Sequence, residues 1–489
     1  MPKIRIISDV APAKSLTAGI VLEQIIMQLP AEFDLECEIL IDDGLVDYKI
    51  SNFLNPSSCR WYRKPRESWP IPKIFSPLIH FGELLSTLET KKIVKTILKH
   101  ESRNSSDLIL VAVQGQTSIR IANLLLKNNH NVSTIHWDPW QWWHREKGVP
   151  NSFYKEVNRL NDSIRLSGSH LIPSQNFGVE LGLCLQQGIV LYPHVGTFQN
   201  TAKKRGDVIR IAFIGQTYSK AELKDFLQFL EDRDWAFGEK KVELHVYGNS
   251  SFPNSVHIIQ HGWINYDSVA KDIARCDAAF LPYPRSEEFE DVARQSFPSK
   301  LATYVTAGLP IIYLGPNYSS FATLIEEIGI KLGNIKSSCW ETSILELLAN
   351  HNVDDMKIHE IYKRYFSSSA QKKSISDWLL FSGINPIQWS SKSIPFYHNT
   401  TVRQLNRPIE DELYSVKVGR TLFLIQRILS SPKRISLRFK TTIERRLRTL
   451  LKLSKFLFTL GGFNRVRHII RIMFPNPGIV ISLIKNRRV

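Results

Sequence analysis

Short apolar runs alternate with helical patterns along most of this 489-residue chain, and that alternation constrains the fold most strongly. In the first part, the pattern predicts a helix from Gly19, a helix at 118–127, and strands at 4–8, 108–113, 132–136, 169–173 and 189–192. The alternation stops in a polar, basic stretch between Pro193 and Asp207, which is typical of an interdomain linker. It then restarts, with strands expected at 209–214, 242–247, 256–259, 278–281 and 310–314, and helices at 221–230, 266–275, 299–306 and 321–328.

Strands that alternate with helices indicate an α/β fold with a parallel sheet covered on both faces. Two such units predict two Rossmann-like domains, at 1–195 and 207–385, that face a cleft. We expect residues 386–489 to form a basic, largely helical C-terminal extension. In open α/β sheets ligands bind at the carboxyl ends of strands, so the side chains at those ends are the candidates for a site.

The basic charge of the chain lies almost entirely in the extension. The net charge is +17, from 63 basic and 46 acidic residues, and residues 401–489 alone carry +16. The interval 443–455 has helical periodicity, with Ile443, Leu447, Leu450 and Leu451 on one face. The opposite face carries four cations: Arg445, Arg448, Lys452 and Lys455. A cationic amphipathic helix is typical of binding to an anionic membrane surface. A helical hairpin packed on the body is the alternative; nucleic acid is not expected, because no binding motif is present.

Cysteine usage and the first residues favour a cytoplasmic protein. The five cysteines show no metal-ligand or redox spacing, which fits a reduced compartment: Cys37, Cys59, Cys184, Cys276 and Cys339. Residues 1–8 have no signal-peptide layout. No uncharged apolar run approaches the roughly 20 residues that span a bilayer. We therefore expect a peripheral protein on the inner face of the cell membrane.

The densest chemical signal runs from Gly262 to Pro310. A strand ends at Pro282, a polar loop follows, and Pro298-Ser299-Lys300-Leu301 begins a helix. Ser296 or Ser299 could cap that helix. Free backbone N–H groups at a helix start, with Lys300 beside them, suit a diphosphate.

These residues resemble the nucleotide-binding half of GT-B glycosyltransferases, most closely the large retaining family 4. The resemblance implies transfer of a sugar from a nucleotide-sugar donor to a glycan or lipid-linked acceptor hydroxyl, with retention and without a metal. It implies no cofactor, because the nucleotide-sugar is a substrate. It also implies a set of donor-binding residues: Gly19, Gly215, Lys220, Gln295, Ser296, Ser299, Lys300 and Thr303.

Two of those positions depart from the family. The family carries glutamates where this chain has Gln295 and Thr303. A shifted alignment could recruit Glu287, Glu288 or Glu290 instead. The alternative function is a non-catalytic homologue that binds a glycan or scaffolds a membrane assembly.

An aromatic segment, residues 136–144, follows the strand expected at 132–136 and holds four tryptophans. Indole rings suit a sugar or lipid contact through their apolar faces and N–H donors. Asp138 is the candidate for orienting the acceptor hydroxyl or the donor sugar, and His136 is the second catalytic candidate. The alternative is a buried aromatic cluster with a capping aspartate. Asp232-Arg233-Asp234 is interpreted as a solvated charge run at a helix end.

Overall fold

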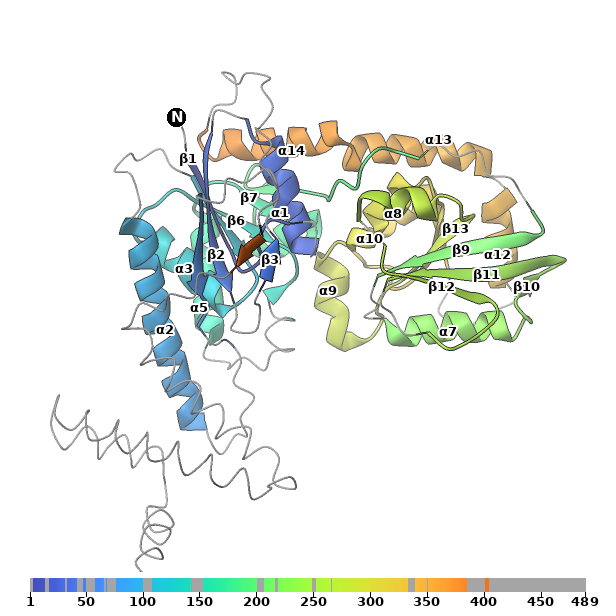
Figure 1. Ribbon diagram of the computed structural model, residues 1–489, viewed down its shortest axis with the longest axis horizontal. Coiled ribbons are helices and arrows are strands. Elements are labelled where there is room, and N and C mark those ends of the chain that lie inside the picture. The colour runs from blue at the N-terminus through green and yellow to red at the C-terminus, as the bar shows by residue number, and fades with distance from the viewer. Residues whose placement is uncertain are drawn as a thin grey trace, which may run out of the picture.

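The computed structural model describes residues 3–13, 17–30, 33–41, 47–49, 58–65, 67, 76–99, 108–140, 142, 153–199, 206–215, 219–248, 252–264, 266–332, 339–349, 351–384 and 401–403. They form two α/β bodies side by side, each built on one twisted sheet (Figure 1). The predicted pair of Rossmann-like domains is confirmed. Arg445, Arg448, Lys452 and Lys455 lie outside the described residues. Within the described ranges, no helix combines the length and the apolar character needed to cross a bilayer.

The first sheet is parallel throughout, in the order β4-β2-β1-β5-β6-β7-β8. Its strands are β1 (Lys3–Ser8), β2 (Asp34–Ile41), β4 (Cys59–Arg63), β5 (Leu108–Val113), β6 (Val132–His136), β7 (His170–Ile172) and β8 (Gly188–Val190). Its helices are α1 (Thr17–Gln28), α2 (Ser76–Lys99), α3 (Gln116–Lys127), α5 (Tyr154–Arg165) and α6 (Gln175–Leu181). β1 and β5 are buried along their whole length, as expected of central strands covered on both faces.

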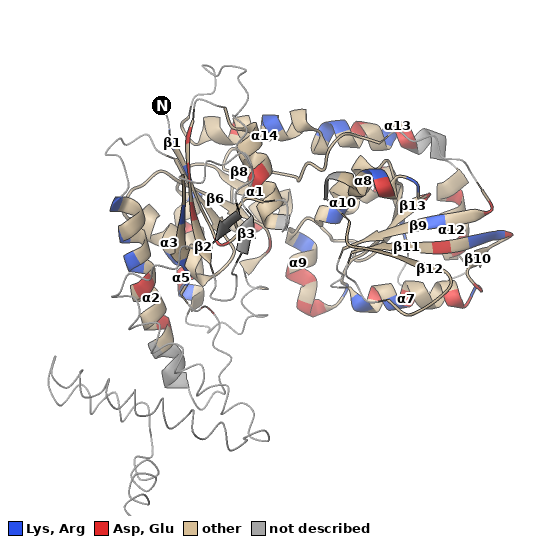
Figure 2. Cartoon of the chain, in the orientation of Figure 1, with Lys and Arg blue, Asp and Glu red and all other residues tan. Residues whose placement is uncertain are grey.

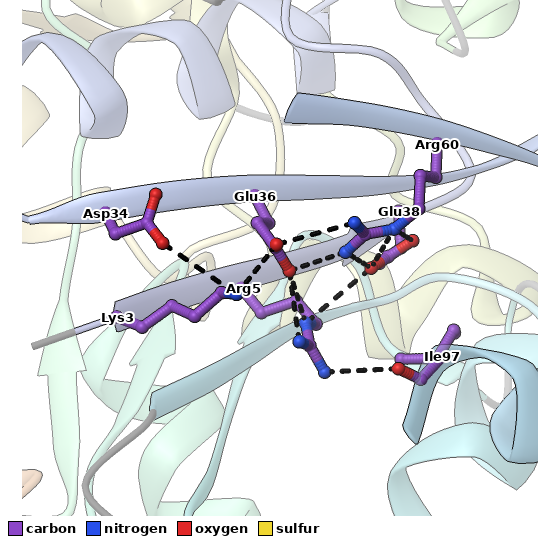
Figure 3. Close-up of polar contacts among 7 residues, drawn as sticks. All are labelled: Lys3, Arg5, Asp34, Glu36, Glu38, Arg60 and Ile97. Carbon is purple, nitrogen blue, oxygen red and sulfur yellow. Dashed lines mark hydrogen bonds and ion pairs between the residues drawn. The ribbon is translucent and has the colours of Figure 1, made fainter. Parts of the chain in front are cut away.

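One face of this sheet carries buried charges as well as apolar side chains. β2 contributes Glu36 and Glu38, which meet Arg5 of β1 and Arg60 of β4 (Figure 3). Arg5 Nε donates to Glu36 Oε2 at 3.1 Å, and its Nη1 donates to the carbonyl oxygen of Ile97 in α2 at 3.4 Å. Because these acids and bases neutralise one another and fill their hydrogen bonds, the face can be buried.

The second sheet has the order β10-β11-β9-β13-β14-β15, with β12 paired to β11. Its strands are β9 (Val208–Ile214), β10 (Ala236–Phe237), β11 (Lys240–Tyr247), β12 (Ile258–Gly262), β13 (Ala278–Pro282), β14 (Ile311–Leu314) and β15 (Gly329–Lys331). Its helical elements are α7 (Lys220–Glu231), α8 (Tyr266–Ile273), the short η4 (Glu287–Phe289), α9 (Glu290–Gln295), α10 (Ser299–Thr306), α11 (Ala322–Ile328) and α12 (Cys339–Ala349). All pairings are parallel except that of β10 with β11.

The end of the second domain returns to the first. α13 (His351–Ile361) and the π-helical turn η5 (Tyr362–Phe366) lead into α14 (Ser368–Phe381), and the two helices bridge both bodies in Figure 1. Ile375, Trp378 and Leu379 of α14 are buried in the core formed by β1, β2 and α1. The last helix of the segment 207–385 therefore packs on the N-terminal domain. A two-stranded sheet pairs β3 (Asp47–Lys49) with β16 (Thr401–Arg403).

Candidate active site

A pocket of about 380 Å³ lies between the two domains, at the carboxyl ends of both sheets. The first domain lines it with residues that follow its strands, including Gln114, His136 and Asp138. The second domain contributes Pro282 at the end of β13 and the start of α10. In each sheet the order of the strands reverses at the first strand, because later strands lie on both sides of it. β2 and β5 flank β1, and β11 and β13 flank β9. The pocket therefore occupies the position where open α/β sheets bind ligands.

Lys300 is the cation of this pocket, and its side chain is only partly exposed. Its Nζ lies 4.7 Å from the centre of the Phe213 ring, and burial lowers the pKa of Lys300 to about 7. An anion that enters the pocket would favour the charged form and restore the ordinary pKa. Lys300 is thus suited to hold a phosphate.

The start of α10 differs from the expected cap. The N-cap residue is Pro298, with φ −72° and ψ 111°, and no side chain caps the helix. Ser296 and Ser299 both line the pocket, and the Ser296 hydroxyl donates a hydrogen bond to Asp138. The expectation that Ser296 or Ser299 caps this helix is wrong, because Pro298 holds the N-cap position and the Ser296 hydroxyl binds Asp138. The first-turn amides of a helix have no intrahelical acceptor, so they remain suited to an anion.

Asp138 joins the two domains across the pocket. Its Oδ1 accepts a hydrogen bond from the Ser296 hydroxyl at 2.7 Å, although the two residues are 158 positions apart in the sequence. Burial raises the pKa of Asp138, and the hydrogen bond from Ser296 opposes that effect. The carboxyl group is therefore placed by the second domain while it lines the pocket.

His136 is a buried, neutral histidine that lines the same pocket. It is 1% exposed, and burial, together with the neighbouring His170, lowers its pKa well below the ordinary value. The Thr134 hydroxyl lies 2.6 Å from His136 Nε2 and 2.9 Å from His170 Nδ1. The other ring nitrogen, His136 Nδ1, has no hydrogen-bond partner among the described residues. A neutral imidazole held in this way can offer one hydrogen bond to a bound ligand.

Both interpretations of the aromatic segment, a ligand contact and a buried cluster, agree with part of the structure. Trp140 is 3% exposed and lies in the first-domain core, with its ring 5.2 Å from that of His136. Trp137 and Trp142 line the pocket, and Trp142 lies 6.2 Å from the ring of Phe289 in the second domain. One tryptophan is therefore structural, while two face the pocket and could contact an apolar sugar face.

Two of the predicted donor-binding residues, Gly19 and Gly215, lie next to pocket residues but do not line the pocket. Gly215 follows β9 with φ +70°, a conformation that favours glycine, and a Cβ there would make an ordinary contact of 3.5 Å with Lys300 Cε. Gly19 lies in α1, where a Cβ would come within 2.6 Å of the Ala11 carbonyl oxygen. The packing of α1 against the loop after β1 thus explains Gly19, next to the pocket residues Val10 and Ala18.

Other predicted donor-binding residues do not line the pocket. Lys220, the first residue of α7, is exposed, and Thr303 is 4% exposed inside the second domain. The Gln295 carbonyl oxygen accepts a hydrogen bond from Ser174 at 2.6 Å, another contact between the domains.

The alternative acids and the charge run lie outside the pocket as well. Glu287 and Glu288 are exposed, and Glu290 pairs with Arg294 at 2.8 Å. In the run 232–234, Arg233 pairs with Glu341, and Asp232 Oδ1 accepts a hydrogen bond from Gln228 at 2.8 Å. Within the described residues, no group of three or more histidine, cysteine or acidic side chains is arranged to hold a metal ion.

Several pocket residues were not predicted from the sequence, among them the polar residues Ser219 and Gln114. Ser219 is 3% exposed and lines the pocket one position before Lys220. Gln114 follows β5 at the carboxyl edge of the first sheet. Its position directly after a predicted strand is the signal that would have identified it.

Solved structures share this architecture, although no protein-family model and no curated protein sequence matches the chain. Sucrose-phosphate synthase from Thermosynechococcus elongatus is similar at a TM-score of 0.53 and 12% identity, over 77% of this chain and 97% of that one. The N-terminal domain of Candida albicans trehalose-6-phosphate phosphatase gives 0.51 and 11%, over 78% and 97%. A trehalose-6-phosphate synthase, studied for glycosyl transfer with retention, gives 0.51 and 10%, over 78% and 99%.

The chain has the GT-B fold. The pocket with Asp138 and Lys300 is accordingly the GT-B interdomain cleft.

Proposed function

We propose that this protein is a glycosyltransferase that moves a sugar from a nucleotide-sugar donor to an acceptor hydroxyl. The observation that carries the proposal is the position of Lys300, at the start of α10, in a pocket between two parallel sheets. A cation and helix-start amides at the carboxyl edge of a sheet suit a diphosphate. The similarity to a sucrose-phosphate synthase and a trehalose-6-phosphate synthase supports the same reaction class.

In this proposal the second domain stabilises the leaving group. The bond between the anomeric carbon and the diphosphate breaks with its electron pair on the diphosphate. The acceptor oxygen forms the new bond to the anomeric carbon and passes its proton to the departing diphosphate oxygen. Lys300 and the first amides of α10 neutralise the charge that develops on the diphosphate. No covalent bond forms between the sugar and the protein. Such fixed donors act most strongly in a site from which water is excluded.

The first domain orients the sugar and the acceptor. Asp138 accepts a hydrogen bond from a hydroxyl group, while Ser296 keeps the carboxyl group in place. His136, neutral and joined to Thr134, holds a further hydroxyl. We extend the proposal to retention of configuration, supported by the retaining trehalose-6-phosphate synthase, and to a lipid-linked or polysaccharide acceptor, supported by the basic extension. We also propose that the reaction needs no metal, because Lys300 and the helix-start amides can neutralise the diphosphate.

Calorimetric titration with UDP, GDP, ADP and CDP tests the donor site. We expect saturable binding of one nucleotide, weakened roughly 100-fold in Lys300→Ala because a charge-assisted contact is worth about 1.5–3 kcal/mol. Lys220→Ala is the matched control, since Lys220 is exposed and does not line the pocket. Equal losses in the two variants would remove Lys300 from the phosphate site.

A non-catalytic GT-B homologue is the second candidate function. It is favoured by Gln295 and Thr303, which replace the two acids of the family and do not line the pocket. The two functions separate in an assay that measures nucleotide release from a panel of nucleotide-sugars. Nucleotide binding without release, in the presence of lipid-linked and polysaccharide acceptors, would favour the non-catalytic homologue.

A further inference from the structure

The outer face of α2 combines apolar and basic side chains on the side of the first domain that faces away from the second. Leu84 and Leu88 are 55% and 48% exposed, large values for leucines on a packed helix. The next exposed positions along the helix are all lysines: Lys91, Lys92, Lys95 and Lys99. Figure 2 shows these basic residues grouped on the upper part of α2. The opposite face, with Ile93 and Ile97, is buried in the domain core.

A second pocket of about 380 Å³ opens where this lysine series meets α3. Three lysines line it, together with three apolar side chains and one amide: Lys91, Lys95, Lys99, Val94, Leu98, Leu124 and Asn128. No acidic side chain belongs to this lining, and no ion pair joins the three lysines to an acid within the described part of the chain. The pocket is therefore a concentrated positive site with an apolar component.

The lysines and apolar side chains of this surface together indicate which kind of partner it binds. Lysines at positions 91, 95 and 99 span about 12 Å along the helix, at 1.5 Å per residue. A bilayer of anionic phospholipids supplies phosphates at that spacing, with apolar chains for Leu98 and the exposed leucines. Charge repulsion disfavours the C-terminal extension as the occupant of this surface, because residues 401–489 carry a net charge of +16. No aromatic side chain lines the pocket, so it lacks the stacking platform of a single-stranded nucleic-acid site.

We propose that the outer face of α2 binds the surface of anionic phospholipid bilayers. Leu84 and Leu88 enter the headgroup region, while Lys91, Lys95 and Lys99 contact lipid phosphates around the pocket. The surface is separate from the interdomain pocket and needs no bound nucleotide. Vesicle binding and nucleotide binding therefore test the two proposals independently.

The test uses the full chain and vesicles of phosphatidylglycerol with phosphatidylcholine, in a sedimentation assay. The triple variant Lys91→Gln, Lys95→Gln and Lys99→Gln should lose at least about tenfold in its partition coefficient, since each basic residue near an anionic surface contributes. The control carries the same charge change on exposed lysines of the second domain: Lys224→Gln, Lys240→Gln and Lys241→Gln. A loss in the control as large as in the α2 variant would overturn the proposal.

A second measurement locates the contact even if the triple variant does not fold. An environment-sensitive dye at Leu88→Cys, in a chain with Cys184→Ser and Cys339→Ser, should shift to the blue with anionic vesicles. It should not shift with vesicles of phosphatidylcholine alone. The control places the dye on the native Cys184, which is exposed on the same domain. An unshifted Leu88→Cys spectrum on bound protein, or a shift with an RNA oligonucleotide but not with vesicles, would overturn the proposal.

Discussion

The two domains bury basic side chains in opposite ways. In the first sheet, Arg5 is 1% exposed but contacts Glu36, Glu38 and the carbonyl oxygen of Ile97 (Figure 3). Although burial raises the pKa of Glu36, hydrogen bonds from Arg60 and Lys3 bring it down to about 2. In the second domain, burial lowers the pKa of Lys300 to about 7 beside the Phe213 ring.

That difference separates a structural charge from a functional one. A buried cation enclosed by acids is already neutralised and has little left to offer a ligand. A desolvated cation at the edge of a pocket gains most when an anion arrives. The comparison therefore favours a stabilising role for the cluster around Glu38, and it supports the proposal that Lys300 binds a ligand.

The largest expected effect comes from breaking the structural cluster. Glu38→Gln removes a fully buried carboxylate and leaves Arg5 and Arg60 with one acid fewer. We expect a loss of about 3 kcal/mol or more in the free energy of unfolding, because an uncompensated buried charge is costly. Urea unfolding followed by circular dichroism measures it.

The control for that loss is an ion pair in the second domain. Glu243 lies 3.8 Å from Arg210 and both side chains are partly exposed, so Glu243→Gln should cost less than about 1 kcal/mol. Equal losses in the two variants would contradict the assignment of a special role to the first-domain cluster.

A smaller effect should appear in the pH dependence of nucleotide binding. Because the pKa of Lys300 is about 7 without ligand, its charged form is lost as pH rises above 7. Binding restores the proton, so affinity should fall up to about tenfold per pH unit between pH 7 and 9. Calorimetry in buffers of different ionisation enthalpy should detect proton uptake on binding. An affinity that is constant over this range would show that Lys300 does not contact the diphosphate.

The smallest effect concerns the contact between the domains. Asp138→Asn and Ser296→Ala, alone and combined, form a double-mutant cycle on the 2.7 Å hydrogen bond. We expect a coupling of about 1–2 kcal/mol in the free energy of unfolding, as for a charge-assisted hydrogen bond. The exposed pair Gln228–Asp232, at 2.8 Å, should couple by less than about 0.5 kcal/mol. Similar values for both pairs would argue against a role for Asp138 in joining the domains.

Sequence patterns predicted the central strands because these are rich in apolar residues: β5 is apolar along its whole length, and β1 contains Ile4, Ile6 and Ile7. They missed β2, whose Glu36 and Glu38 give the strand a polar pattern. The cations that neutralise these acids come from β1 and β4, so the local sequence cannot show that the acids are buried. α14 was missed for a similar reason, since Trp378 packs on a domain that lies far away in the sequence.

The candidate site was predicted in part. Lys300 was found because Pro298 and the helix after it form a local pattern. The hydrogen bond between Asp138 and Ser296 joins residues 158 positions apart, and no local pattern reports such a contact. Lys220 and Thr303 were selected by resemblance alone, and the packing of α7 and α10 keeps both away from the pocket lining.

The return of α14 to the first domain has a mechanical consequence. The chain passes between the domains twice, and hydrogen bonds join the two passages. His194 Nδ1 lies 2.7 Å from the Phe366 carbonyl oxygen. The Tyr362 hydroxyl donates to the Gly196 carbonyl oxygen at 2.8 Å. Because the two passages are joined, we expect them to act as a hinge with a single axis. Such a hinge permits rocking of the domains but resists sliding and twisting. A protease cut between Gln199 and Gly206 would sever one passage and still leave both halves in a single particle.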